Sequence, residues 1–195
     1  MPKNTSSSKE PAQNGVRRET VPDPSGGVRR TLCAKAKKPK VVVLVGLPGS
    51  GKSTYAEKSA GTALSSDELR GLLVDDPEAQ NIHRIVFALL RRLLKHRLEL
   101  KRPVTYVDAT NLTPWERRPY IKLAQRYDAT IEAVLFDVPV AECQRRNRAR
   151  ARNVPADVIT KMAARLVRPT TKEGFSRVTV VVWDRMRFKP SFPAK

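Results

Sequence analysis

From about residue 40 onward, short β-branched runs alternate with stretches in which apolar residues recur every three or four positions. This alternation is typical of a parallel sheet covered by helices on both faces. It predicts strands at 41–45, around 63–64, and at 104–107, 131–136 and 178–182. It predicts helices at 52–59, 67–72, from 82 until Pro103, at 114–126, from about Val140, and after Pro155. We therefore expect an α/β fold with five parallel strands flanked by helices, and Ser66 as the cap of the turn that holds Asp67.

The helix predicted from residue 82 has one apolar and one basic face. Its apolar positions are Ile82, Ile85, Val86, Leu89, Leu93 and Leu94, and its basic positions are Arg84, Arg91, Arg92, Lys95, Arg97, Lys101 and Arg102. The apolar stripe is most simply part of the core. The basic face is either solvated or lies along a phosphate backbone.

The first 38 residues differ from the rest of the chain in composition and in hydrophobic pattern. They are rich in Pro, Ser, Gly and charge, and they show no sustained hydrophobic period. Such a segment cannot bury enough apolar surface to offset the entropy lost on ordering. We therefore predict a flexible basic arm at 1–38, a P-loop kinase domain at 39–188 and a short tail at 189–195. The arm is either a solvated leader or a non-specific nucleic-acid contact.

The charge balance favours a polyanionic partner. The chain has 38 Lys and Arg against 19 Asp and Glu, a formal net charge of +19. Residues 1–40 hold ten of these cations and three of the acids, so residues 41–195 still carry a net +12. Nucleic acid is the commonest partner for such a field, although a phosphate-rich small molecule or solubility alone would also account for it.

The apolar runs and the two cysteines bear on the compartment. The longest aliphatic run, 41–45, is far shorter than the roughly 20 residues that cross a bilayer, so we expect no membrane association. The first thirty residues contain no apolar block of the kind a secretory signal needs. Cys33 and Cys143 show no metal-binding spacing and suit a reducing compartment. We therefore expect a cytoplasmic protein.

A glycine-rich motif lies between the first predicted strand and the first predicted helix. It reads Gly46-Leu47-Pro48-Gly49-Ser50-Gly51-Lys52-Ser53, which fits G-x-x-x-x-G-K-S. Its backbone N–H groups can surround a polyphosphate at the N-terminus of the helix. Lys52 is expected to reach the β and γ phosphates, Ser53 to bind the bridging Mg²⁺, and Thr54 to add a contact. The predicted cofactors are ATP and Mg²⁺, and the predicted nucleotide contacts run through Gly46, Pro48, Gly49, Ser50, Gly51, Lys52, Ser53 and Thr54.

Two further groups follow the second and third predicted strands, at the sheet edge where doubly wound folds bind ligands. Asp67 and Arg70 share a helical face, so the carboxylate could accept a hydroxyl proton while the guanidinium holds the acceptor. By itself Asp67 would be an ordinary first-turn residue, but its position near a P-loop favours catalysis. Asp108 belongs either to the Mg²⁺ shell or acceptor site, or to a helix cap near Thr113. Thr110 and Asn111 are candidate acceptor contacts.

An arginine-rich segment comes before the helix break at Pro155. Its arginines are Arg145, Arg146, Arg148, Arg150 and Arg152. Because residues two apart on a helix point in different directions, at least one should face the triphosphate and stabilise charge that develops during phosphoryl transfer. We expect Arg146 to contact the nucleotide. The alternative is a basic surface for nucleic acid, and different arginines could fill both roles.

These motifs resemble the kinase domain of polynucleotide 5′-hydroxyl kinases, within a broader group of small P-loop kinases that includes AAA-domain and zeta-toxin-like kinases. The resemblance covers about residues 41–182. Besides the P-loop, it rests on the Asp67-x-x-Arg70 pair, Asp108-Ala109-Thr110-Asn111, Phe136-Asp137-Val138-Pro139, the Arg-Asn segment from Arg146, and Pro169-Thr170-x-x-Glu173-Gly174-Phe175.

The resemblance implies transfer of the ATP γ-phosphate to the 5′-hydroxyl of DNA or RNA. It implies Asp67 as general base, Arg70 as the grip on the acceptor-side phosphate, and Arg150 as the lid arginine, with Arg146, Arg148 and Arg152 close to it in sequence. The chain shows no Asp-x-Asp phosphatase signature, so we expect separate phosphatase or ligase partners. The alternatives are a kinase of the same fold that acts on a small molecule or a tRNA-linked group, and a nucleotide-gated nucleic-acid-binding module.

Overall fold

The computed structural model describes residues 38–76, 79, 81–149 and 153–182 of the 195-residue chain. Its strands are β1 (Lys40–Val45), β2 (Thr62–Ser65), β3 (Val104–Asp108), β4 (Thr130–Asp137) and β5 (Arg177–Val182). Its helices are α1 (Lys52–Glu57), α2 (Ser66–Val74), α3 (His83–Glu99), α4 (Pro114–Arg126), α5 (Val140–Arg148) and α6 (Ala156–Arg165), with a 3₁₀ turn at Thr171–Glu173. The predicted α/β fold and its five strands are confirmed.

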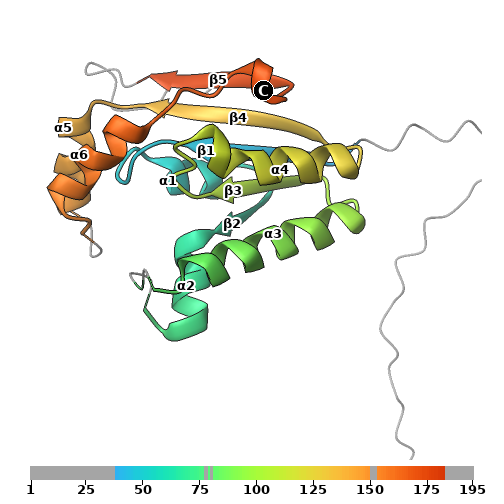
Figure 1. The fold of residues 1–195 in the computed structure, drawn as a ribbon, viewed down its shortest axis with the longest axis horizontal. Helices are drawn as coiled ribbons and strands as arrows, with labels where there is room; N and C mark the ends of the chain where they lie inside the picture. The colour runs from blue at the N-terminus through green and yellow to red at the C-terminus, as the bar shows by residue number, and fades with distance from the viewer. Residues whose placement is uncertain (1–37, 77–78, 80, 150–152, 183–195) are drawn as a thin grey trace, which may run out of the picture. The chain divides into compact units, whose positions relative to one another are not determined.

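The five strands form one parallel sheet in the order β2-β3-β1-β4-β5 (Figure 1). β1 lies in the middle, with Val43 in register with Val107 of β3 and with Ala133 of β4. Because every strand points the same way, the loops after β1, β2 and β3 leave the sheet at one edge. The short helices α5 and α6 lie at this same end of the sheet, in orange at the left of Figure 1.

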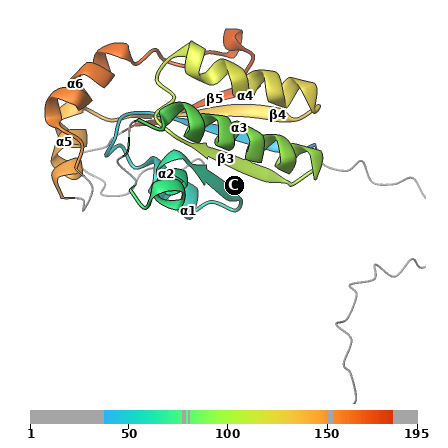
Figure 2. The same ribbon diagram turned by 60° about the horizontal axis from the view of Figure 1, so that its bottom comes forward.

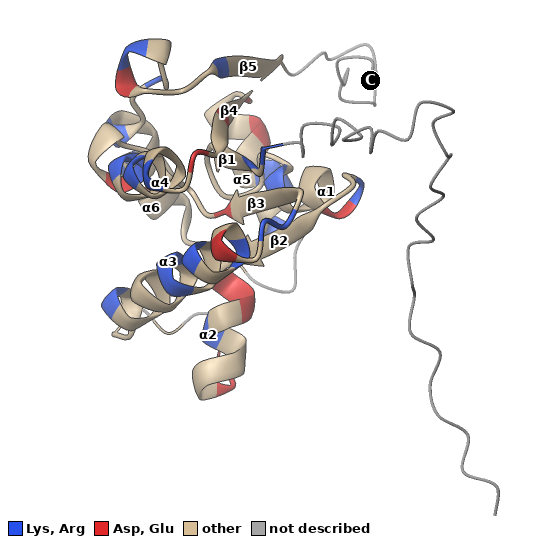
Figure 3. Ribbon diagram, turned by 90° about the vertical axis from the view of Figure 1, so that its right-hand side faces the viewer, with Lys and Arg blue, Asp and Glu red and all other residues tan. Residues whose placement is uncertain are grey.

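Helices cover both faces of the sheet, as the end-on view of Figure 3 shows. Val41, Val43 and Val45 face α3 and α4, whereas Val42 and Leu44 face α1. A strand that is buried on both faces reads as a continuous β-branched run rather than an alternating one. This explains why 41–45 has no polar position.

A separate apolar cluster lies at the carboxyl end of the sheet. Leu47 from the P-loop packs with Leu112, Cys143 of α5 and Ile159 of α6. This cluster fixes α5 and α6 against the P-loop. Among the residues that the structure describes, no helix combines the length and the apolar character needed to cross a membrane.

Several predicted helix boundaries were wrong, including those of α2 and α3. The cap of α2 is Ser65, whose hydroxyl accepts from the N–H groups of Asp67 and Glu68 at 3.3 and 3.4 Å, and Ser66 is already helical. α3 ends at Glu99, so Lys101 lies outside it in the left-handed region at φ 49°. The predicted tail, and the predicted arm apart from Lys38, lie outside the described residues.

Candidate active site

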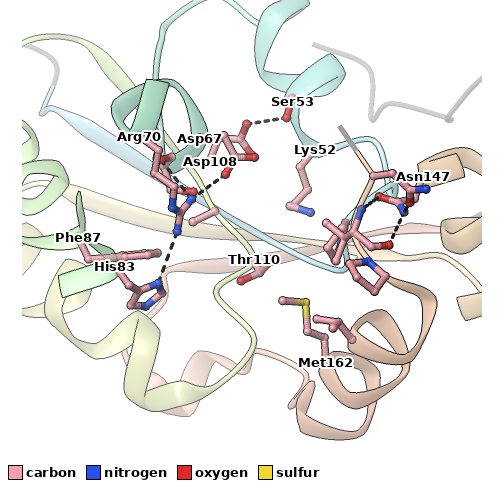
Figure 4. Close-up of a pocket in the computed structure, with 17 residues that line it drawn as sticks. Lys52, Ser53, Asp67, Arg70, His83, Phe87, Asp108, Thr110, Asn147 and Met162 are labelled. Carbon is pink, nitrogen blue, oxygen red and sulfur yellow. Dashed lines mark hydrogen bonds and ion pairs between the residues drawn. The ribbon is translucent and has the colours of Figure 1, made fainter. Parts of the chain in front are cut away.

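A cleft of about 410 Å³ opens at the carboxyl edge of the sheet (Figure 4). Residues from four parts of the chain line it: the P-loop with the start of α1, the α2–α3 region, the end of β3, and the α5–α6 region. Doubly wound sheets bind ligands at this edge, because the loops after neighbouring strands separate there. Seven of the predicted site residues therefore meet in one cleft: Pro48, Lys52, Ser53, Asp67, Arg70, Asp108 and Thr110.

The P-loop has the backbone shape that its glycines allow. Gly49 and Gly51 have φ of 81° and 98°, in the left-handed region that costs other residues energy. A Cβ on Gly49 would lie 2.4 Å from the Cys143 carbonyl oxygen, so the loop touches α5 closely at this point. The ammonium of Lys52 is buried and donates to the Leu47 carbonyl at 2.7 Å. The side chain therefore lies inside the loop that is predicted to surround the phosphates.

Ser53 and Asp108 are in direct contact at the wall of the cleft although they are 55 positions apart in the sequence. The Ser53 hydroxyl donates to Asp108 Oδ2 at 2.7 Å. Thr113, not Asp108, caps α4, accepting from the Glu116 N–H at 3.3 Å. Of the two roles considered for Asp108, the helix cap is therefore excluded. A hydroxyl and a carboxylate in contact are oxygen donors of the kind Mg²⁺ prefers, so the residues present fit this ion.

The Asp67–Arg70 pair is formed, and its two members differ in exposure. Arg70 donates to Asp67 Oδ1 at 2.8 Å, and its side chain is 6% exposed against 54% for that of Asp67. A second contact joins Arg70 to His83 Nδ1 at 3.5 Å. The structure thus holds the guanidinium in place while leaving the carboxylate accessible to the cleft.

The start of α3 supplies two cleft residues that the sequence reasoning did not single out, His83 and Phe87. Their rings lie 4.5 Å apart between centroids. Burial, and next the charge of Arg70, hold the pKa of His83 below its ordinary value. The imidazole is therefore neutral near pH 7. No local spacing signals these residues, because their place in the cleft depends on how α3 packs beside α2.

Thr110 and Asn111 were both predicted to hold the acceptor, but the structure separates them. Thr110 lines the cleft. Asn111 is fully buried, and its amide donates to the Leu44 carbonyl at 2.7 Å. It ties the chain after β3 to β1 and is not among the residues that line the cleft. The structure therefore does not bring Asn111 to the acceptor side.

The arginine-rich helix α5 lies beside the P-loop. Arg146 donates to Glu142 at 2.7 Å, and a Cβ on Gly51 would lie 3.9 Å from the Arg146 guanidinium. Arg145 also donates to Glu142, and these pairs lower the pKa of Glu142 to about 2. Arg146 is thus near the predicted phosphate site, as expected for a nucleotide contact. The predicted lid arginine, Arg150, and its neighbour Arg152 lie outside the described residues.

Asn147 fixes the approach to α6. Its amide donates to Asn153 Oδ1 at 2.6 Å and to the Val154 carbonyl at 2.7 Å, and its oxygen accepts from the Val154 N–H at 3.2 Å. The side chain is buried yet lines the cleft. Asn147 therefore holds the end of α5 to the start of the next helix at the wall of the site.

A buried ion pair supports the same end of the sheet from behind. Arg117 of α4 is fully buried and donates to both carboxylate oxygens of Glu173, at 2.9 and 2.8 Å. The same guanidinium donates to the carbonyls of Asn111, Leu112 and Val167. One side chain thus joins the loop after β3 to the segment that follows α6.

The comparison with known proteins agrees with this geometry. A family model described as an AAA domain matches residues 41–169, which include the P-loop, the Asp67–Arg70 pair and Asp108. This chain belongs to that family. Its fold and motifs are those of P-loop kinases, a class that binds ATP.

One curated relative is the bifunctional polynucleotide phosphatase/kinase of Schizosaccharomyces pombe, 25% identical over 154 residues. The match covers 75% of this chain and 34% of that protein, so the chain spans about a third of the relative's length. Among solved structures, a chain of the Pnkp1/Rnl/Hen1 RNA repair complex superposes with a TM-score of 0.58 at 26% identity, covering 71% of this chain and 47% of that one. Kti12 from Chaetomium thermophilum, solved with ADP-AlF3, has a TM-score of 0.58 at 17% identity, covering 74% and 89%, and shares the fold.

Proposed function

We propose that this P-loop kinase transfers the γ-phosphate of ATP to the 5′-hydroxyl of a polynucleotide. The observation that carries the proposal is one cleft in which a P-loop faces a carboxylate–guanidinium pair. Lys52 and Ser53 line it on the nucleotide side, and Asp67 and Arg70 line it on the other. The S. pombe relative named as a polynucleotide phosphatase/kinase supports the choice of acceptor.

On the nucleotide side, the chain would supply cations that bind the phosphates and residues that hold the metal ion in position. Lys52 would leave its contact with the Leu47 carbonyl and bind the β and γ phosphates. Ser53 and Asp108 would hold Mg²⁺, which neutralises charge on the phosphate oxygens when bound. Arg146, beside Gly51, would add a further cation from α5.

On the acceptor side, Asp67 would act as general base. Its exposed carboxylate accepts the proton of the 5′-hydroxyl as that oxygen bonds to the γ-phosphorus and the bond to the ADP oxygen breaks. The buried Arg70 holds Asp67 in place through the 2.8 Å contact and presents charge to the first phosphate of the acceptor strand. A neutral His83 behind Arg70 can accept its second N–H.

The size of the cleft supports a second candidate. About 410 Å³ is within the range of small-molecule pockets, so the same residues could phosphorylate a small phosphorylated acceptor. The third candidate, a nucleotide-gated binding module, predicts nucleic-acid binding without a phosphorylated product. The basic surface and the relatives favour the polynucleotide.

The test is transfer of labelled γ-phosphate from ATP to 5′-hydroxyl DNA and RNA oligonucleotides. We expect labelled product from the native protein and losses of at least about a hundredfold in Lys52→Ala and Asp67→Ala. Lys58→Ala and Glu68→Ala are the matched controls, because both residues are exposed and lie near the two targets in sequence. Full activity in Asp67→Ala would show that Asp67 is not the general base. Phosphorylation of a metabolite but of no oligonucleotide would favour the second candidate.

A further inference from the structure

A second hollow lies away from the cleft, on the outer surface of α3 and α4. Its volume is about 540 Å³. These helices pack side by side on one face of the sheet (Figure 2). The residues that line it are Arg91, Arg92, Lys95 and His96 of α3, and Pro119, Lys122, Leu123 and Arg126 of α4. We call this hollow the α3–α4 groove.

The charge of the α3–α4 groove is largely uncompensated. Five of its eight lining residues are Lys or Arg and none is an acid. Lys95 pairs with Glu99 at the far end of α3, at 3.4 Å. Within the described part of the chain, no carboxylate lies in ion-pair distance of Arg91, Arg92, Lys122 or Arg126. Like charges gathered in this way repel one another, and a bound row of phosphates would relieve that repulsion.

An exposed aromatic residue extends the groove along α4. Trp115 is 76% exposed and lies four residues before Pro119 and seven before Lys122, which places all three on one side of the helix. The guanidinium of Arg118 lies 5.9 Å from the centre of the Trp115 ring. A basic groove with an accessible aromatic ring suits single strands, because unpaired bases stack on such rings while the cations follow the backbone. A duplex would offer phosphates but no free base faces.

Helix α3 connects the active-site cleft to the groove, because its first residues line the one and its middle lines the other. α3 begins at His83, which lines the cleft, and runs in the same direction as α4 away from that end of the sheet (Figure 1). The Lys and Arg positions of both helices are blue in Figure 3. Arg91 comes eight residues after His83 and Lys95 twelve, or about 12 and 18 Å along a helix that rises 1.5 Å per residue. At roughly 3.4 Å per stacked nucleotide, a strand whose 5′ end lies in the cleft would reach the groove after about four to six nucleotides.

We propose that the α3–α4 groove binds the phosphate backbone of a single-stranded acceptor downstream of its 5′ end. The inference rests on the proposed polynucleotide kinase function and adds a specificity site to it. The cleft holds the first nucleotide, and the groove with Trp115 holds the nucleotides that follow. The enzyme therefore prefers single strands of more than about six nucleotides.

The experiment compares two acceptors and two charge-matched variants. The acceptors are a nucleoside 3′-monophosphate and a single strand of about twelve nucleotides, which is long enough to reach the groove. The groove variant is Arg92→Gln/Lys122→Gln/Arg126→Gln, and the control is Lys58→Gln/Lys172→Gln/Arg177→Gln. All six residues are exposed, and the control residues line neither the cleft nor the groove.

We expect the groove variant to raise KM for the long strand about tenfold, with kcat and the KM of the nucleotide unchanged. The plot of log(kcat/KM) against log salt has a negative slope, and its magnitude should fall by about 2 in the groove variant, since each lost contact to a single strand removes about 0.7. The control should behave like the native protein. Trp115→Ala should also raise KM for the long strand, and Trp115→Phe should restore it, because stacking needs a ring.

The proposal is wrong if the two triple variants change the KM for the long strand equally. It is also wrong if the groove variant changes the KM for the long and the short acceptor equally. Anisotropy of the labelled strand tests binding without turnover. The native protein could phosphorylate neither acceptor while the groove variant, unlike the control variant, binds the labelled strand more weakly than the native protein does. The proposed kinase function would then be wrong, and the proposed binding of single strands by the groove would be supported. If polyglutamate competes as well as the strand does, the groove binds acidic polymers in general and the assignment is wrong.

Discussion

The Arg117–Glu173 pair makes a prediction about how the active-site end of the fold is held together. Glu173→Ala would leave a fully buried guanidinium with three carbonyl partners and no opposite charge. Removing one member of a buried pair typically costs about 3–5 kcal/mol. The two lost contacts, at 2.9 and 2.8 Å, agree with this, because hydrogen bonds to charged groups contribute about 1.5–3 kcal/mol each.

For a domain of this size, such a loss is a large part of a total stability of about 5–15 kcal/mol. Tm should fall by about 10 °C, and the midpoint of urea unfolding should fall with no change in m. The double variant Arg117→Met/Glu173→Leu should be more stable than Glu173→Ala, because it leaves no buried charge unpaired. A loss below about 1 kcal/mol in Glu173→Ala, or strictly additive single effects, would refute the reasoning.

Two further predictions concern the nucleotide side, and a third concerns the stability of α5. Gly49→Ala forces a side chain toward α5, 2.4 Å from a carbonyl oxygen, so calorimetry should show ATP binding weakened by at least about tenfold. Asp108→Asn removes the charge beside Ser53, so kinase assays should need about tenfold more Mg²⁺ for half-maximal rate, and an unchanged requirement would contradict the assignment. The pKa of Glu142, held at about 2 chiefly by Arg145, means that its pairing stabilises the fold at neutral pH and is lost as pH falls from about 4.5 toward 2. The Tm difference between Glu142→Gln and the native protein should therefore shrink over that range.

Much of the site could be predicted because its residues belong to local patterns. The P-loop needs glycines, a lysine and a serine at fixed spacing between a strand and a helix, and all of these lie within eight consecutive residues. Asp67 and Arg70 are three apart, so one helical turn is enough to join them. The arginine-rich segment predicted that Arg146 lies near the nucleotide, and in the structure Arg146 lies beside Gly51.

The errors concern residues whose roles depend on parts of the chain that are distant in sequence. Asn111 looks like an acceptor ligand because it ends a strand at the ligand edge, but its amide satisfies the Leu44 carbonyl, 67 positions away. Ser66 and Ser65 are both good caps, and the choice between them depended on where β2 ends. Neither outcome can be read from spacing alone.

The sequence by itself determined the α/β class, the nucleotide-binding loop and the Asp67–Arg70 pair, because hydrophobic period and short motifs act within one or two turns of chain. Only the tertiary structure brought Ser53 to Asp108, Arg117 to Glu173, and the basic faces of α3 and α4 into one groove. Those contacts depend on the strand order β2-β3-β1-β4-β5 and on which helices share a face of the sheet. The burial of apolar surface over the whole domain sets that arrangement, and no local spacing encodes it.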